Sequence, residues 1–172
     1  MSAIRLRGAT SGTTDVVAAA IAGDGVLTLP SGTGTLALDS AVGKVLQVVR
    51  ATDATDRLTT STSFVDASIS VTITPQRSTS AILIIWTSNP YIDNLYGILR
   101  ITDSSNNAIP GAQVCAFGPA QVQIISTMIG YDLPGSISAK TYKGRFRVSG
   151  TAILTIQNSA ATGQLFAIEV AA

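Results

Sequence analysis

The chain has 172 residues, of which 46% are hydrophobic and 12% are charged, and its formal net charge is +1. So weak a charge offers no electrostatic footprint for a nucleic acid or an anionic membrane. The sequence contains no histidine, which excludes Ser-His-Asp and Cys-His catalysis and histidine-ligated zinc within one chain. We therefore expect a protein that is not an enzyme, binds no cofactor, and has much of its surface covered by partners.

The first 42 residues form a low-complexity arm of Ala, Gly, Thr and Ser. Three consecutive alanines at 18–20 could support a helical turn, but the threonines and valines before them favour a strand, and the Gly-Asp-Gly sequence at 23–25 favours a turn. The simplest interpretation is a pair of short strands, which is marginal in water by itself. Its apolar side chains therefore need another surface to cover them. The candidates for that assembly interface are Val16, Val17, Ile21, Val26, Leu27, Leu29 and Leu36.

The N-terminus predicts no export or membrane insertion. Residues 1–8 include two arginines, but no apolar segment of the signal-peptide type follows them. No run of about 18 apolar residues occurs anywhere, so we expect no membrane-spanning helix. The protein is expected to be soluble and made in a cytoplasm.

The folded body is expected to start at Gly43, with a strand over 44–51. The stretch 68–74 alternates strictly, with Ile69, Val71 and Ile73 on one side and hydroxyl side chains on the other, which is typical of a half-buried antiparallel strand. Residues 81–86 are continuously apolar and predict a central strand that is covered on both faces.

Further strand-like runs follow at intervals of about 8–15 residues, separated by turn signals, and no convincing amphipathic helix interrupts them. The pattern predicts an all-β fold, a jelly-roll-like antiparallel β-sandwich over 43–172 preceded by an extended N-terminal arm with short strands over 1–42. The remaining predicted strands cover 95–101, 114–117, 122–129, 141–148, 152–156 and 164–170.

One aromatic cluster has two interpretations. The aromatic residues Trp86, Tyr91 and Tyr96, interleaved with Asn89, Asp93 and Asn94, could form a platform on which sugar rings stack. Alternatively, Trp86 ends a core strand and the tyrosines cap the rim of the sandwich with their hydroxyl groups in water, which is the arrangement we favour.

Basic residues concentrate at Lys140, Lys143, Arg145 and Arg147. On a strand, Arg145 and Arg147 share one face while Phe146 points to the core. The strip could dock an acidic surface or an anionic glycan, but a solvated strand face whose charge discourages edge pairing is the favoured interpretation.

Two polar loops contain residue types that can bind calcium. Asp53 with Asp56, and Asp103 with Asn106 and Asn107, supply hard oxygen ligands, but neither group has the ligand number or spacing of a dedicated loop. Both fit turn chemistry better, and we expect no metal site.

The remaining reactive residues suggest no chemistry. Cys115 lies in an apolar run and is expected to be an inert core thiol. Glu169 is the single glutamate, so a pair of catalytic carboxylates would have to come from aspartates. The glycine-rich segment 32–34 lacks the helix and lysine of a phosphate-binding loop. No catalytic residue is proposed.

Several segments resemble small virion proteins of tailed bacteriophages, especially those of cyanobacteria and other aquatic bacteria. The body segments that carry the resemblance are Gly43-Lys44-Val45-Leu46-Gln47-Val48-Val49, then 62–66, 70–75, 80–84 and 165–172. In the arm, 25–30 and 33–36 are similar to the repetitive N-terminal modules of phage fibre and decoration proteins.

The resemblance implies a homotrimeric β-sandwich that is fixed to the virion through its arm, with the major capsid protein or another virion protein as partner. A single head with an arm and no long shaft favours capsid decoration, the role of a cement protein. The alternative is a short tail fibre whose Trp86–Tyr96 region binds host surface glycans.

Overall fold

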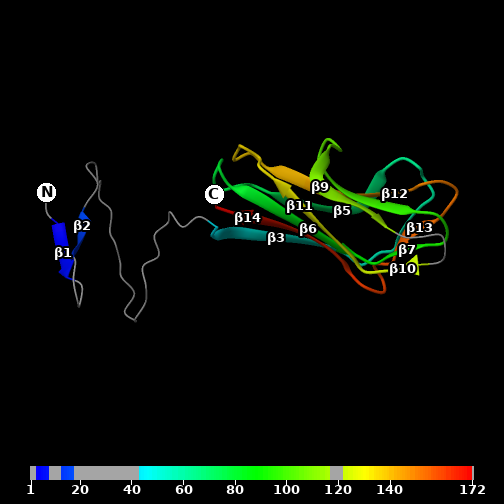
Figure 1. Cartoon of the computed structure of the whole chain (residues 1–172), viewed down its shortest axis with the longest axis horizontal. Coiled ribbons are helices and arrows are strands. Elements are labelled where there is room, and N and C mark those ends of the chain that lie inside the picture. Colours follow the sequence, from blue (N-terminus) through cyan, green and yellow to red (C-terminus); the bar gives the residue numbers. More distant parts are fainter. Residues whose placement is uncertain (1–2, 8–12, 18–42, 117–121, 172) are drawn as a thin grey trace. The chain divides into compact units, whose positions relative to one another are not determined.

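The computed structural model describes residues 3–7, 13–17, 43–116 and 122–171. The chain separates into two units, Met1–Ala37 and Leu38–Ala172, which are described one at a time (Figure 1). Among the described residues every regular element is a strand, and no helix is long and apolar enough to cross a membrane.

The first unit contains an antiparallel pair, β1 (Ala3–Arg7) and β2 (Thr13–Val17), in which Ala3 lies opposite Val17. The strand predicted around Val16 and Val17 is present, but its partner is β1 rather than the segment 26–29, which lies outside the described residues. The missed signal is the alternation of apolar and basic side chains in residues 3–7, which is a strand pattern.

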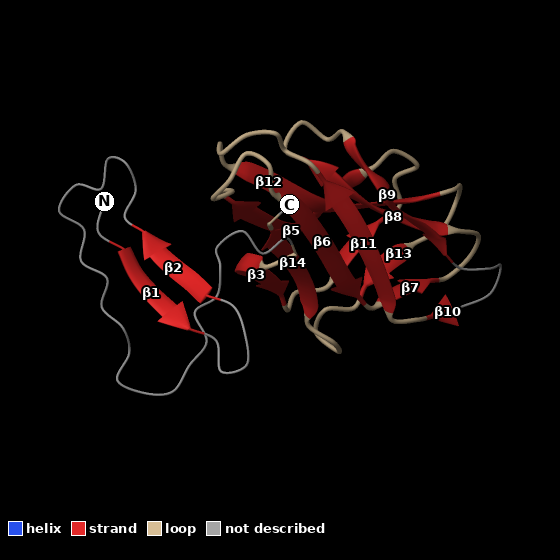
Figure 2. Cartoon of the chain, turned by 60° about the vertical axis from the view of Figure 1, so that its left-hand side comes forward, coloured by secondary structure: helices blue, strands red, loops and turns tan. Residues whose placement is uncertain are grey.

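The second unit is an antiparallel sandwich of two four-stranded sheets, in the orders β11-β6-β14-β3 and β5-β12-β8-β9, with a small third sheet ordered β10-β7-β13-β4 (Figure 2). The prediction of an all-β antiparallel sandwich is therefore confirmed, whereas the jelly roll and the arm stay predictions. The strands are β3 (Val45–Asp53), β4 (Arg57–Thr59), β5 (Val65–Ile73), β6 (Ala81–Ser88), β7 (Pro90–Ile92), β8 (Gly97–Asp103), β9 (Ala108–Ala116), β10 (Val122–Gln123), β11 (Ser126–Asp132), β12 (Lys140–Val148), β13 (Leu154–Ile156) and β14 (Gly163–Val170).

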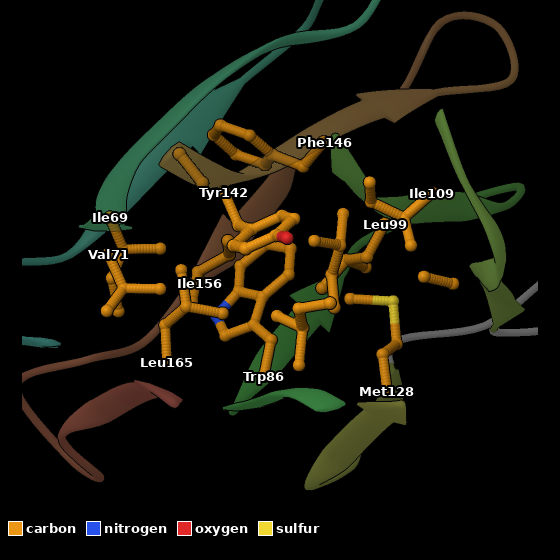
Figure 3. Close-up of a cluster of buried hydrophobic side chains, with 14 of the residues drawn as sticks. Ile69, Val71, Trp86, Leu99, Ile109, Met128, Tyr142, Phe146, Ile156 and Leu165 are labelled. Carbon is orange, nitrogen blue, oxygen red and sulfur yellow. The ribbon is translucent and has the colours of Figure 1, made fainter. Parts of the chain in front are cut away.

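The chain passes between the two large sheets at nearly every connection, since β3, β6, β11 and β14 belong to one sheet and β5, β8, β9 and β12 to the other. Strand β3 contacts β5 across the sandwich at one side, and β11 contacts β9 at the other side. The core fills the space between these sheets with apolar side chains from both (Figure 3). Its largest fully buried members are Trp86, Tyr142 and Phe146.

Strand β5 matches the sequence pattern, because Ile69, Val71 and Ile73 are buried and the hydroxyl side chains between them are exposed. Strand β6 is central in its sheet, as predicted, but the prediction that both its faces are covered is wrong for the single chain. Ile82, Ile84 and Trp86 are buried, whereas Leu83 and Ile85 are only partly buried on the outer face of the sheet.

Two predicted strand boundaries are wrong. The run 122–129 is two strands, because the chain pairs with β7 through Gln123, leaves the small sheet at the exposed Ile124 and Ile125, and pairs with β6 from Ser126 onwards. Strand β9 begins at Ala108 rather than 114, although Pro110 and Gly111 follow. Proline is tolerated there because β9 is an edge strand.

Candidate interaction surfaces

The outer face of the β11-β6-β14-β3 sheet carries seven apolar side chains, which we call the apolar face. All seven meet in two rows across the sheet. In one row Ile168 lies opposite both Val48 and Leu83, and Leu83 lies opposite Tyr131; in the other, Ile85 lies between Phe166 and Ile129. The members of the apolar face are Val48, Leu83, Ile85, Ile129, Tyr131, Phe166 and Ile168.

These side chains are open to solvent in the single chain. Val48, Ile129 and Tyr131 are each more than half exposed, at 56%, 57% and 55%, and the other four are partly buried. Isolated exposed apolar residues are ordinary, but a contiguous patch that spans four strands marks an interaction surface.

The apolar face has few polar neighbours. Arg50 ends the second row on β3, and its guanidinium lies 5.7 Å from the centre of the Phe166 ring. The next row along the strands is polar, with Gln164 between Thr52 and Thr87, and Thr87 opposite Thr127. The apolar surface is therefore bounded on one side by hydroxyl and amide groups.

The sequence signal for this face is present in β6 and β14. Residues 81–86 are apolar at both parities, and in β14 the buried Leu165 and Ala167 alternate with Phe166 and Ile168, which are also apolar. Such doubly apolar strands are typical of strands that are covered on both sides. The described part of the chain covers only one of the two sides.

The first and last described residues of the body, Gly43 and Ala171, lie side by side. The Gly43 N–H donates to the Ala171 carbonyl, and the Ala171 N–H donates to the Lys44 carbonyl, both at 2.8 Å. The segment 1–42 therefore joins the sandwich beside its C-terminal strand. Figure 1 shows the small sheet with β7, β10 and β13 at the opposite end of the body.

Glu169 holds this end together, a role that the sequence did not indicate. Its carboxylate is fully buried and accepts hydrogen bonds from the Gln47 side chain at 2.5 Å and from the backbone N–H groups of Gln76 and Arg77 at 2.8 and 3.3 Å. Burial alone would raise the pKa of Glu169, but the hydrogen bonds outweigh it and lower the pKa. The single glutamate thus ties β3 and the turn before β6 to β14.

The predicted glycan residues do not form one platform. Trp86 is 1% exposed, and its ring packs in the core against Gly144, so its faces are not accessible to a sugar. Tyr91 is partly buried in β7, while Tyr96 is half exposed and its backbone N–H donates to the Ser149 hydroxyl at 3.1 Å. The placement of Trp86 follows from β6, where it shares a parity with the buried Ile82 and Ile84.

The candidate assembly residues of the arm are described only in part. Val16 and Val17 lie in β2, while Ile21, Val26, Leu27, Leu29 and Leu36 lie outside the described residues. The thiol of Cys115 is also outside the described side chains, although its backbone belongs to β9.

The two loops weighed for calcium use their carboxylates internally. Asp53 accepts two hydrogen bonds from Arg57, at 2.8 and 3.1 Å, and one from the Asn158 amide at 3.0 Å. The Arg57 hydrogen bond is the main reason that the pKa of Asp53 is lowered. Asp103 likewise accepts the backbone and side-chain N–H groups of Asn107. Within the described residues no group of three acidic or cysteine side chains could hold a metal ion.

The four basic residues of the predicted strip do not all lie on the same side of β12. Lys143, Arg145 and Arg147 lie on the outer face of β12, while Phe146 and Val148 are buried beneath them. Lys140 stands at the other parity, so alternation puts it on the opposite side of the strand.

A surface hollow lies near Asp93, lined also by Thr60, Thr62 and residues 150–153. Its one carboxylate, Asp93, accepts the Ile153 backbone N–H at 2.7 Å. No second titratable side chain lines it, so the hollow offers no acid–base pair. The chain matches no model of a known protein family and no curated protein.

Proposed function

We propose that this chain is a structural protein of a tailed-bacteriophage virion, a homotrimer that decorates the capsid and stabilises its shell as a cement protein. The observation that supports it best is the apolar face. A sandwich whose central strands are apolar on both sides, and which covers one side, is built to bury the other side against a further protein surface.

A second copy of the chain is the partner that this face fits best. The two rows contain no charged group except Arg50 at their edge, so two such surfaces can meet without burying an unpaired charge. Full burial of each leucine- or isoleucine-sized side chain contributes about 1.5–3 kcal/mol. The threefold form of the assembly is what the resemblance implies.

The arm supplies the attachment in this proposal. Its apolar residues, Val16, Val17, Ile21, Val26, Leu27, Leu29 and Leu36, bury against sister subunits and the major capsid protein, or another virion protein. The burial of Trp86 favours decoration over a fibre that binds glycans through the Trp86–Tyr96 region.

Immunogold labelling of intact virions with antibody against this chain tests the location. Gold spread over the head is the expected result. Gold confined to the tail would replace decoration with the tail-fibre function, and no gold on intact particles, with labelled purified protein as the positive control, would refute a virion role.

A further inference from the structure

The outer face of the second large sheet carries two arginines that lie directly opposite each other. A row across this sheet runs Asp66 on β5, Arg145 on β12, Arg100 on β8 and Gln113 on β9. Like charges directly opposite in an antiparallel pair are destabilising. The register of β8 against β12 therefore places two positive charges side by side on this face.

A third arginine joins them around one aromatic ring. The guanidinium groups of Arg100 and Arg147 lie 4.1 and 5.1 Å from the centre of the Phe64 ring. Arg145 donates to the Phe64 carbonyl, and Arg147 donates to the Thr62 carbonyl at 3.2 Å. These contacts fix the positions of three cations on one face of the sheet.

The described part of the chain places one carboxylate beside these three positive charges, that of Asp66 opposite Arg145, and the two form no ion pair. Arg100 donates to the neutral amide of Gln113 at 2.8 Å, and no described carboxylate forms an ion pair with Arg100, Arg145 or Arg147. The Nε atom of Arg145 is buried and has no hydrogen-bond partner among the described residues. That buried Nε is not accessible from the surface, so what the cluster offers a ligand is its concentrated positive charge, and guanidinium groups pair best with planar or tetrahedral oxyanions.

We infer that this arginine cluster, Arg100, Arg145 and Arg147, binds an anionic polysaccharide through its sulfate or carboxylate groups. Lys143 adds a fourth cation to the same face. It alternates with Arg145 and Arg147 along β12, and alternate residues of a strand are about 6.6–7 Å apart. The neighbouring outer-face side chains are the hydroxyl groups of residues such as Ser70 and Thr72. Among the described residues of this face no large apolar side chain is fully exposed, and Phe64 is only partly so, which suits a saccharide better than a protein surface, whose interfaces have an apolar core.

This site does not depend on the proposed virion function. It lies on the β5-β12-β8-β9 sheet, whereas the apolar face lies on the other sheet of the sandwich, so self-association leaves the cluster accessible. A decoration protein and a tail fibre could both use it.

The test measures binding of the full chain to dextran sulfate, with neutral dextran of the same length as the comparison. We expect binding to dextran sulfate that weakens as salt is added, and none to neutral dextran. Arg100→Gln and Arg145→Gln should each weaken binding about tenfold. Lys140→Gln is the matched control, because it removes the same charge from the other side of β12 and should leave the affinity within about twofold.

Arg100→Lys separates oxyanion recognition from plain charge. It keeps the charge but loses the planar fork of donors, and it should still weaken binding. Because Arg145 also anchors the Phe64 segment, thermal unfolding of each variant is recorded. Arg100→Gln provides the decisive comparison, because it gives up the Phe64 ring contact and the Gln113 hydrogen bonds but no side-chain hydrogen bond to the backbone of the described residues.

Three results would overturn the inference. Equal binding to neutral dextran would show that the anionic groups are not recognised. An equal loss in Lys140→Gln would show that net charge, not the cluster, is responsible. Equal or tighter binding of poly-glutamate or duplex DNA would identify a different class of partner.

Discussion

The indole of Trp86 lies so close to the α-carbon of Gly144 that a methyl group there would stand 2.8 Å from two of its ring carbons. The same methyl group would stand 2.9 Å from Ile69. The largest side chain of the core therefore extends from β6 across the sandwich to β12, where only a glycine leaves room for it (Figure 3). A larger side chain at 144 would therefore have to displace the indole or Ile69.

Gly144→Ala should therefore destabilise the sandwich by about 1–3 kcal/mol, the usual penalty for forcing a methyl group into a packed core. Urea unfolding, followed by far-ultraviolet circular dichroism, measures it in any background, whereas tryptophan fluorescence would be lost with Trp86, the single tryptophan. Trp86→Phe provides the matched background, because a smaller ring relieves the clash, so the alanine penalty should shrink there. An equal penalty in both backgrounds would mean that the Trp86–Gly144 contact is not the cause.

The sequence alone predicted much of this core but not this contact. The alternation of Ile69, Val71 and Ile73 determines which face of β5 is buried, because every second residue on the other side is a hydroxyl residue. In β6 both parities are apolar, so periodicity cannot say which face meets the second sheet. The sequence therefore allowed Trp86 to lie either in the core or in a sugar platform. In the folded chain Trp86 is buried in the core.

The apolar face and the arginine cluster could not be predicted from the sequence, for a related reason. Arg100 and Arg145 are 45 positions apart, and only the register of β8 against β12 brings them together. Leu83 and Ile168 meet through the register of β6 against β14. Cross-strand neighbours leave no local pattern in a sequence, so the strands could be predicted while the rows across them could not.

The apolar face leads to a prediction about self-association. Leu83→Lys places a charge in the middle of the face, beside Ile168 and Tyr131, where burial against a second copy would leave it unpaired. We expect association to weaken by at least about a hundredfold, while the chain stays folded because Leu83 points away from the core. Sedimentation equilibrium measures the oligomeric state.

Thr87→Lys is the matched control for this experiment. Thr87 lies on the same strand and the same outer face, but in the polar row with Gln164 and Thr127, so its substitution should affect association far less. A wild-type chain that sediments as a monomer would contradict the proposed interface, and so would equal effects of the two lysines.

The buried carboxylate of Glu169 predicts a loss of stability in acid. Because its pKa is lowered in the folded chain, its contribution is fully present above the pKa of an unfolded glutamate, about 4.3, and is lost as the pH falls through the lower folded pKa. Glu169→Gln should destabilise the chain by roughly 2–4 kcal/mol at neutral pH, since the amide places donors against the N–H groups of Gln76 and Arg77.

The free energy of unfolding as a function of pH checks this prediction. The wild type should lose stability below about pH 5, and the Glu169→Gln chain should lose less over the same interval. Asp66→Asn serves as the exposed comparison, since Asp66 accepts one backbone N–H, from Ser68. Parallel pH profiles for the wild type and Glu169→Gln would assign the acid sensitivity to other carboxylates.

Removing residues 1–42 should separate attachment from folding. The core cluster is formed by residues from 67 onwards, and the first backbone contacts of the body are those of Gly43 and Lys44 with Ala171, so the truncated chain should keep its melting temperature. It should also keep self-association through the apolar face, but it should no longer bind virions stripped of this protein.

The matched control is a full-length chain with the arm residues in scrambled order, which keeps composition and length but loses the pattern of Val16, Val17 and the other apolar positions. Virion binding by the truncated chain at wild-type affinity would assign attachment to the sandwich instead of the arm.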